Sequence, residues 1–256
     1  MSSSIPLFDA LAADYDAHFD VPHRRAYDEL AWELVQPLLP ARGGLVVDAG
    51  CGVGRWASRL VALGYEVVGI EPAPAMAAAA RARMLPGFRV LAQSIEDVEL
   101  GESQVGAVLA LGSLQYVRDP AAAVQRFAAW TRPGGAVCVL VDSLAALVVE
   151  LLRAGREEEA QRRLETRLGT WVQGEHAAEH HLLDRAALEA AFHGAGLVDV
   201  ECRGLLVGAS IFGRDELTER LRAGWDAQLS LERRLAQQIV LADLGKQLLA
   251  HGRRPG

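Results

Sequence analysis

VVDAGCGVGRWA, residues 46–57, is the most informative stretch of this 256-residue sequence. An apolar, β-branched run reaches an acid, three glycines then stand in five positions, and a helical pattern follows. Glycines at positions 50, 52 and 54 allow positive φ angles and a close approach of the backbone to a ligand. The helix that follows offers unpaired N–H groups at its N-terminus. This order of strand, tight turn and helix predicts a nucleotide site.

Alternating strands and helices extend outward from this stretch. Apolar runs over residues 66–71, 88–94, 105–112 and 136–143 alternate with helical windows. Short apolar runs separated in this way predict βαβ units and a parallel sheet that is covered on both faces. Because ligands of such sheets sit at the carboxyl ends of the strands, the loop after residue 49 is the predicted site.

The length suits one α/β domain with appended helices. The expected parts are an N-terminal helical lid (1–40), a cofactor-binding core (41–143), a helical insert (144–183), the end of the core (184–207) and a helical tail (208–256). Within the insert, helical windows at 144–154 and 156–168 precede GTWVQGEHAAEHHLL, which is expected to be irregular. A helix follows with Asp184 as its N-cap. Residues 197–207 are predicted to form a late strand, and residues 215–250 to be helical throughout, with Leu217, Leu221 and Trp225 on one face.

Charge and cysteine usage exclude several classes of function. The net charge is −7 and no basic stripe is present, so nucleic acid is not the expected partner. Cys51, Cys138 and Cys202 are odd in number and far apart, which predicts free thiols and a reducing cytoplasm. The N-terminal residues lack a cationic region, so no signal peptide is expected. No uninterrupted apolar run approaches about 20 residues, so no membrane span is expected.

Two cofactors fit the glycine loop. A dinucleotide site has G-x-G-x-x-G around a pyrophosphate, whereas Arg55 occupies the third glycine position here. Asp48, just before the first glycine, suits a cationic group rather than a phosphate. Glu71 ends the second strand, where a carboxylate can bind a ribose diol. S-adenosylmethionine carries an ammonium, a sulfonium and a ribose and has no phosphate, so the pattern favours it over NAD.

The same motif resembles the first motif of class I S-adenosylmethionine-dependent methyltransferases, in particular their small-molecule (type 11/25-like) group. The resemblance covers roughly residues 8–207 and includes GIEPAPAM, AQSIEDVEL, ALGSLQYVRDP, RPGG and YDAHF. It implies a Rossmann-like, seven-stranded, mostly parallel sheet whose last strand is antiparallel. It also implies that Ser94 replaces the usual Asp of the adenine clamp, and that Gln115–Tyr116 replaces a frequent Glu-His pair. The cofactor-binding residues that the motif and the resemblance together indicate are Tyr15, Asp48, Gly50, Cys51, Gly52, Glu71, Pro72, Met76, Ser94, Ile95, Leu111 and Gln115.

The expected reaction is transfer of a methyl group from S-adenosylmethionine to N, O or C of a small molecule, leaving S-adenosylhomocysteine. An Ala- and Arg-rich composition with a single lysine suggests a high-GC bacterial genome and, by association, a secondary metabolite as acceptor. The acceptor pocket is expected between the N-terminal helices, the insert and the tail. Its candidate residues are Phe19, Trp32, Leu147, Trp171, Phe212 and Trp225. A base is needed only if the acceptor must lose its proton early. The candidates for that role are His18, His23, His180, His181 and Tyr116.

Three alternatives remain at this point. The first is an NAD-type oxidoreductase. The second is a zinc hydrolase, because HAAEH matches the H-x-x-E-H pattern, with His176 and His180 as helical ligands and Glu179 as the base. The third is a binding module that keeps the cofactor fold without turnover. No metal is expected under the favoured interpretation, and the protein is expected to be a monomer or a homodimer.

Overall fold

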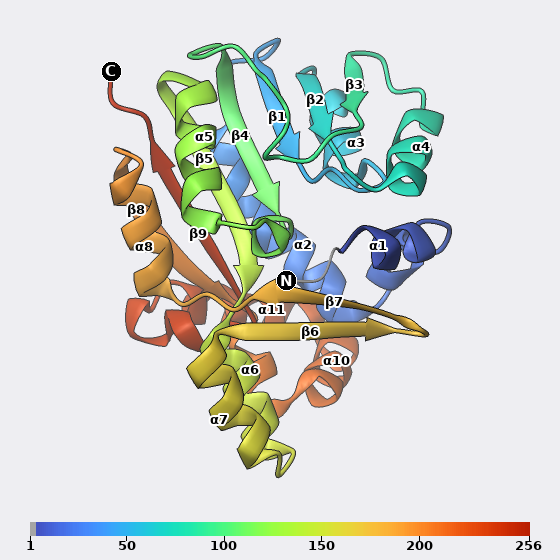
Figure 1. The fold of residues 1–256 in the computed structure, drawn as a ribbon. Helices are drawn as coiled ribbons and strands as arrows, with labels where there is room; N and C mark the ends of the chain where they lie inside the picture. The colour runs from blue at the N-terminus through green and yellow to red at the C-terminus, as the bar shows by residue number, and fades with distance from the viewer. Residues whose placement is uncertain (1–3) are drawn as a thin grey trace.

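A seven-stranded sheet forms the centre of the molecule in the computed structural model, which describes residues 4–256 (Figure 1). The strand order is β3-β2-β1-β4-β5-β9-β8. Neighbouring strands from β3 to β5 run parallel, and β9 pairs antiparallel with both β5 and β8. The predicted α/β fold, with its last strand antiparallel, is therefore confirmed.

The strands are β1 (Leu45–Ala49), β2 (Glu66–Ile70), β3 (Phe88–Leu91), β4 (Val105–Leu111), β5 (Thr131–Asp142), β6 (Leu168–Gln173), β7 (His176–His181), β8 (Val198–Leu205) and β9 (Gln247–Arg253). The α-helices are α1 (Ile5–Leu11), α2 (Pro22–Val35), α3 (Arg55–Ala62), α4 (Pro74–Ala82), α5 (Pro120–Trp130), α6 (Leu144–Arg153), α7 (Glu157–Thr166), α8 (Arg185–Gly194), α9 (Val207–Phe212), α10 (Arg214–Ala223) and α11 (Trp225–Ala236). The 3₁₀ turns are η1 (Asp16–Phe19), η2 (Gln36–Leu38), η3 (Leu114–Tyr116) and η4 (Ile239–Leu244).

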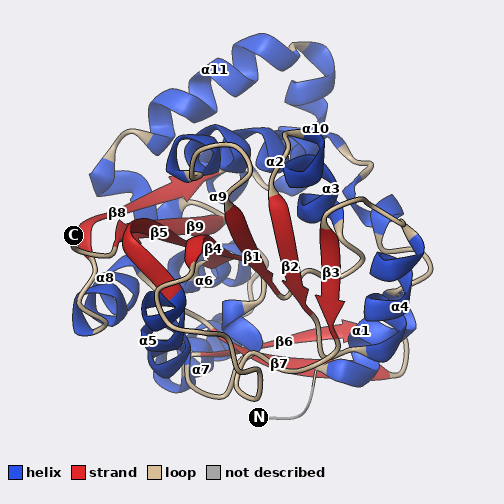
Figure 2. Cartoon of the chain, turned by 90° about the horizontal axis from the view of Figure 1, so that it is seen from above, coloured by secondary structure: helices blue, strands red, loops and turns tan. Residues whose placement is uncertain are grey.

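The sheet separates two apolar cores because its central strands are buried on both faces. One core joins the sheet to α5 and α8 through residues such as Phe127 and Phe192, both fully buried. The other joins the opposite face to α2, α3, α10 and α11 through residues such as Leu30, Leu60 and Leu217. Figure 2 shows helices on both sides of the strands. This layering fixes the carboxyl ends of β1, β2 and β4 at one edge of the sheet.

Two segments differ from the predicted secondary structure. Residues 168–181 are an antiparallel hairpin, β6–β7, and not an irregular stretch. The prediction that residues 215–250 are helical throughout is wrong, because the helix breaks at Gly224 between α10 and α11 and because Gln247 begins the strand β9, which continues to Arg253. Leu248, Leu249 and Ala250 are fully buried between β5 and β8. The local sequence does not predict β9, because three consecutive apolar residues show neither the helical nor the strand periodicity. The segment is extended because it pairs with two neighbouring strands.

Several local predictions are confirmed. The helical windows of the insert become α6 and α7. The Asp184 side chain accepts a hydrogen bond from the Ala187 amide, 2.8 Å away, and so caps α8. All three cysteines are free and buried. Among residues 4–256, no helix is long and apolar enough to cross a membrane.

Candidate cofactor and acceptor site

The glycine loop after β1 has the backbone that its sequence predicts. Gly50, Gly52 and Gly54 have φ angles of +82°, +53° and +83°. A Cβ atom at Gly50 would lie 2.2 Å from the Cβ of Ser113, which follows β4, so no larger residue fits there. At Gly52 a Cβ atom would meet only Tyr15, at 3.8 Å. The loop therefore turns tightly against β4 at Gly50 and stays open toward Tyr15 at Gly52.

Glu71 lies at the carboxyl end of β2 and faces the glycine loop. Its Oε2 accepts a hydrogen bond from the Gly52 amide at 2.9 Å, and its Oε1 accepts one from the Ala73 amide at 2.8 Å. Burial raises the pKa of the Glu71 carboxyl, and these two amides act in the opposite direction. The carboxylate is thus held rigidly beside the loop, with acceptor capacity left for a pair of hydroxyl donors.

A cavity of about 510 Å³ opens between this loop, α1 and the loops after β3 and β4. Nine of the predicted cofactor residues line it: Tyr15, Gly50, Gly52, Glu71, Pro72, Met76, Ser94, Ile95 and Leu111. They come from segments far apart in the chain, and the ends of the parallel strands bring them together. The cavity offers a carboxylate for a diol, apolar walls for a flat ring and an open glycine backbone, which fits the groups of S-adenosylmethionine.

Three predicted cofactor residues, Asp48, Cys51 and Gln115, fall outside the lining that the described residues form. Asp48 is only 1% exposed beneath the loop. Burial, with a further contribution from the charge of Glu71, raises the pKa of its carboxyl to about 7. Its Oδ2 has no hydrogen-bond partner among residues 4–256. Asp48 therefore lies beneath the loop, and its contact with the ammonium of the cofactor stays a prediction.

Cys51 and Gln115 have other partners. The Cys51 sulfur occupies the space beside Gly69 of β2, where a Cβ atom would approach it to 2.6 Å. Gln115 donates from Nε2 to Oδ2 of Asp142 at 3.1 Å, and its Oε1 accepts from the Asp142 amide at 2.8 Å. Gln115 thus holds the end of β5 and belongs to a second, neighbouring cavity.

Asp97 is a wall residue that the sequence prediction missed. It lines the first cavity, and its Oδ2 accepts a hydrogen bond from the Ser94 hydroxyl at 2.7 Å. The Asp97 amide in turn donates to Ser94 Oγ at 3.2 Å. A carboxylate three residues after Ser94 therefore reaches the wall where the family usually has an Asp. The S-x-x-D spacing, typical of a local turn, was the available signal.

The N-terminal segment closes one side of the first cavity. Phe8 of α1 lies edge-on to Tyr116 and Trp171, with ring centroids 5.0 and 5.6 Å apart. Asp9 accepts a hydrogen bond from the Ala75 amide at 2.7 Å and so caps α4. Phe8 and Ile5 are further wall residues that the sequence prediction missed.

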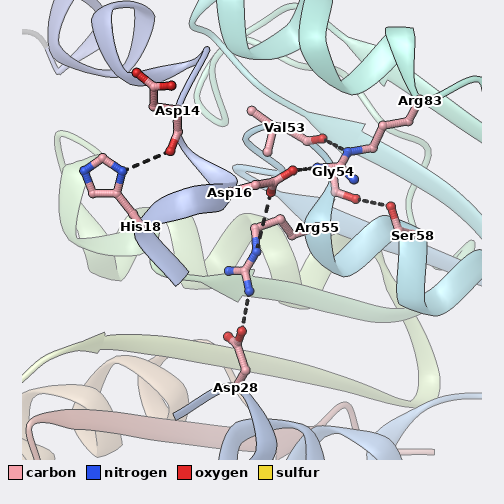
Figure 3. A network of polar contacts seen from close by, with 9 residues as sticks. All are labelled: Asp14, Asp16, His18, Asp28, Val53, Gly54, Arg55, Ser58 and Arg83. Carbon is pink, nitrogen blue, oxygen red and sulfur yellow. Dashed lines mark hydrogen bonds and ion pairs between the residues drawn. The ribbon is translucent and has the colours of Figure 1, made fainter. Parts of the chain in front are cut away.

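An ion-pair network of Asp16, Asp28, Arg55 and Arg83 fastens the same segment to the glycine loop (Figure 3). The guanidinium of Arg55 donates to Asp28 and lies 3.8 Å from Asp16. Arg83 contacts Asp16 at 2.5 Å and also donates to the Val53 carbonyl. Arg55, which replaces the third glycine of a dinucleotide motif, therefore binds the N-terminal segment.

A second cavity of about 410 Å³ adjoins the first. Phe8, Tyr15, Gly112 and Tyr116 line both cavities. Its other walls come from α2, the end of β5, α6, α7, the hairpin, α9 and α10. Of the six predicted acceptor residues, Phe19, Leu147 and Trp171 line it, whereas Trp32, Phe212 and Trp225 pack elsewhere.

The structure separates the candidate histidines. His23 and His180 line the second cavity, whereas His18 and His181 do not. His18 contacts the Asp14 carbonyl, and His181 contacts the Arg118 carbonyl, both by exposed hydrogen bonds. The two predictions that named His18 and His181 as bases are therefore not supported by their positions.

His180 has the environment of a proton acceptor. It is 7% exposed, its ring lies 5.5 Å from that of Tyr116, and it covers Gly169 on the paired strand. Burial lowers its pKa below the ordinary histidine value, and the charge of Asp142 acts in the opposite direction. Within the described part of the chain, no hydrogen bond of good geometry reaches its Nδ1 atom. Burial thus favours the neutral form of the imidazole over the protonated form.

The zinc-hydrolase alternative fails because HAAEH forms the strand β7 and not a helix. Four residues along a strand span about 13 Å, so His176 and His180 cannot share one tetrahedral metal. Glu179 points to the opposite face from His180, as successive residues of a strand do. The NAD-type alternative also loses support, because β9 runs antiparallel between β5 and β8, unlike the sixth strand of a dinucleotide-binding sheet.

Comparisons with known proteins agree with this geometry. A family model described as a methyltransferase domain matches residues 23–202. An uncharacterized methyltransferase of Mycobacterium tuberculosis is 39% identical over 103 residues, which are 40% of this chain and 42% of that protein. A ubiquinone biosynthesis O-methyltransferase of Xanthomonas axonopodis pv. citri is 33% identical over 142 residues, 52% of this chain and 58% of that protein. The chain thus spans about half the length of these curated relatives.

A solved structure shows the same fold over its whole length. The SAM-dependent methyltransferase of Thermotoga maritima superimposes with a TM-score of 0.63 at 19% identity, covering 98% of this chain and 99% of that one. The family match extends over most of the chain and includes the glycine loop, Glu71 and the end of β4. The chain therefore belongs to the methyltransferase domain family, in the class I fold whose cofactor is S-adenosylmethionine.

Proposed function

We propose that the protein methylates a small molecule held in the second cavity, with S-adenosylmethionine held in the first. The observation that carries this proposal is the meeting of the two cavities at Phe8, Tyr15, Gly112 and Tyr116. Methyl transfer needs a donor and an acceptor side by side in a site from which water is excluded. Beside this junction, Phe8 of α1 packs against Tyr116 and against Trp171 of the hairpin β6–β7, so apolar rings border the place where the two reactants would meet.

Five residues that line the first cavity have specific roles in cofactor binding under this proposal. Glu71 binds both ribose hydroxyls, Pro72, Met76 and Ile95 cover the adenine, and the open backbone at Gly52 receives the amino acid part. When bound, the cofactor supplies a methyl group already activated by its sulfonium. The protein must then orient the acceptor and remove one proton, and it need not form a covalent intermediate.

His180 is the proposed proton acceptor. It lines the second cavity next to Tyr116, a residue that both cavities share, and burial keeps it neutral. An acceptor oxygen or nitrogen that carries a proton would pass it to this imidazole as the new bond forms. A ubiquinone O-methyltransferase among the relatives supports an oxygen acceptor without fixing one for this chain.

The first test is calorimetric titration with S-adenosylhomocysteine and, separately, with NAD. We expect S-adenosylhomocysteine alone to bind, and Glu71→Ala to weaken it at least tenfold, since two hydrogen bonds to a charged group are lost. Glu66→Ala is the matched control, because Glu66 is an exposed carboxylate at the other end of β2. Binding of NAD, or equal loss in both variants, would contradict the proposal.

The second test addresses His180 after an acceptor is found by screening phenols and amines for S-adenosylhomocysteine release. His180→Gln is expected to lower kcat about a hundredfold and to abolish the fall in rate below neutral pH. His181→Gln, its half-buried neighbour on β7, which lies outside the cavity lining, is expected to leave both unchanged. A similar loss in the two variants would assign the effect to the hairpin and not to the base.

A further inference from the structure

The second cavity carries an excess of positive charge in an acidic protein. Its charged lining consists of the cations Arg24, Arg156, Arg163, Arg214 and Lys246 and the carboxylates of Asp142, Glu150 and Glu159. Five cations thus face three carboxylates, whereas the whole chain has a net charge of −7. Such local reversal of sign indicates an anionic ligand, because it raises the concentration of anions in the cavity.

Glu150 of α6 is shared between two cations. Its Oε2 lies 2.7 Å from Nζ of Lys246, and its Oε1 lies 2.8 Å from Nη2 of Arg214. Burial acts to raise the pKa of Glu150, but Lys246 and Arg214 together lower it. One carboxylate cannot neutralise both cations, so a positive charge remains at this wall. Lys246 is also the one lysine of the sequence, and its side chain is 20% exposed.

Glu159 of α7 is shared in the same way by Arg156 and Arg163. Arg163 is the more buried of these two, with its side chain 11% exposed. Its terminal nitrogens donate to Glu159 at 2.9 Å and to the Leu168 carbonyl at 2.8 Å. Its Nε atom is buried and has no hydrogen-bond partner in the part of the chain that the structure describes. A buried guanidinium donor left unpaired is unfavourable, and an anion would satisfy it.

Four of the five cations lie with α6 and α7, away from the cofactor loop: Arg156 and Arg163 belong to α7 and its N-cap, and Arg214 and Lys246 contact Glu150 of α6. In Figure 1 the helices α6 and α7 lie below the hairpin, whereas the loop after β1 lies above it. An acceptor that spans the second cavity would therefore place one end near Tyr116 and His180 and the other among these cations.

We propose that this part of the cavity, formed by Arg156, Arg163, Arg214 and Lys246, binds an anionic group of the acceptor, a carboxylate or a phosphate. This inference rests on the proposed function, because it treats the anionic group as part of the methyl acceptor. The preference of the cavity for an anion follows from its lining alone. Guanidinium groups match the two oxygens of carboxylate or phosphate, and Lys246 adds a point charge. The substrate is accordingly a small molecule that carries an anionic group in addition to its nucleophilic atom.

Four probes with one aromatic ring and different charges test this. Benzoate, phenyl phosphate, benzyl alcohol and benzylamine are titrated into the protein, with and without S-adenosylhomocysteine. At least one anionic probe is expected to bind about tenfold more tightly than benzyl alcohol, and the better of benzoate and phenyl phosphate identifies the anion. Arg163→Gln and Lys246→Gln should each weaken that probe about tenfold. Arg162→Gln should leave the affinity unchanged, because Arg162 lies outside the cavity lining. It is a matched control, since it neighbours Arg163 and contacts Glu159 at 3.5 Å.

A second readout uses the single lysine. Acetylation by the succinimidyl ester of acetic acid, followed by peptide mass analysis, reports Lys246 separately from the N-terminal amine. The preferred anion should slow acetylation of Lys246 at least several-fold, and benzylamine should not. The proposal is overturned if no probe binds, if benzyl alcohol or benzylamine binds as tightly as the anions, or if Arg162→Gln matches Arg163→Gln. Failure of S-adenosylhomocysteine to bind would remove the proposed function alone, since the probes also report on the cofactor-free protein.

Discussion

Gly50 is the residue at which the cofactor loop tolerates least change. Its φ of +82° disfavours any side chain, and a Cβ atom would lie 2.2 Å from Ser113 Cβ. Gly50→Ala is expected to lower the free energy of unfolding by more than the ~1–2 kcal/mol that a left-handed backbone costs a residue with a side chain. It is also expected to weaken S-adenosylhomocysteine binding over tenfold. Gly64→Ala is the control, because its φ of +87° is similar but nothing lies within 4 Å of its Cβ position. Urea unfolding and calorimetry measure both, and equal losses would show that the contact with Ser113 is unimportant.

Asp48 makes the stability of the unliganded protein depend on pH. Its folded pKa of about 7 lies above the ordinary value of 3.8, so the fold favours the protonated acid. That stabilisation is complete below the ordinary value and is lost as the pH rises toward 7. At about 1.4 kcal/mol per pKa unit, the loss amounts to roughly 4 kcal/mol. Urea unfolding at about pH 4, 6 and 8 should show that the free energy of unfolding of the wild type falls with pH relative to that of Asp48→Asn. The same pH dependence in both proteins would contradict this.

At the scale of elements, Arg55 joins η1 and α2 to the start of α3. It contacts Asp28 and Asp16, and its guanidinium carbon lies 3.3 Å from the centroid of the Phe19 ring. Arg55→Gln should speed amide hydrogen exchange over residues 14–28 and lower stability by about 1–3 kcal/mol, because the ion pair with Asp28 is largely buried. Exchange followed by mass spectrometry checks this.

The control for Arg55 is Arg25→Gln. Arg25 contacts Asp20 at 2.7 Å, but both side chains are well exposed, at 62% and 75%. Exposed pairs contribute about 0–1 kcal/mol, so exchange over residues 14–28 should change little. If both substitutions altered exchange equally, the ion-pair network would not be what holds the N-terminal segment.

At the scale of the whole molecule, the C-terminal strand completes the sheet. β9 pairs with both β5 and β8, so its removal leaves β8 without a partner strand, leaves β5 paired with β4 alone and opens both cores. Deletion of residues 247–256 should abolish cooperative unfolding. Deletion of only the last two residues should be tolerated, because Arg254, which donates to the carbonyls of Ala129 and Thr131, remains. Thermal melts followed by circular dichroism distinguish the two, and a cooperative melt of the longer deletion would contradict the expectation.

The site was predictable from sequence wherever one short segment carries the chemistry. The glycines at 50 and 52 follow the buried strand β1 and the acid Glu71 follows β2, and parallel strands bring their carboxyl ends together. Asp48 could not be placed in the same way. The pattern put it next to the glycines, but only the packed structure shows it beneath the loop at 1% exposure.

Sequence alone therefore determined the strand–turn–helix unit, the parallel half of the sheet and the class of cofactor, because apolar periodicity and glycine backbone freedom act locally. Tertiary structure decided the rest. Gln247 to Arg253 become a strand because β5 and β8 leave a gap between them. His180, and not His181, faces the second cavity because successive side chains of a strand point to opposite faces, and the pairing of His180 with Gly169 fixes the register. Such choices depend on contacts between residues distant in the chain, which no local pattern records.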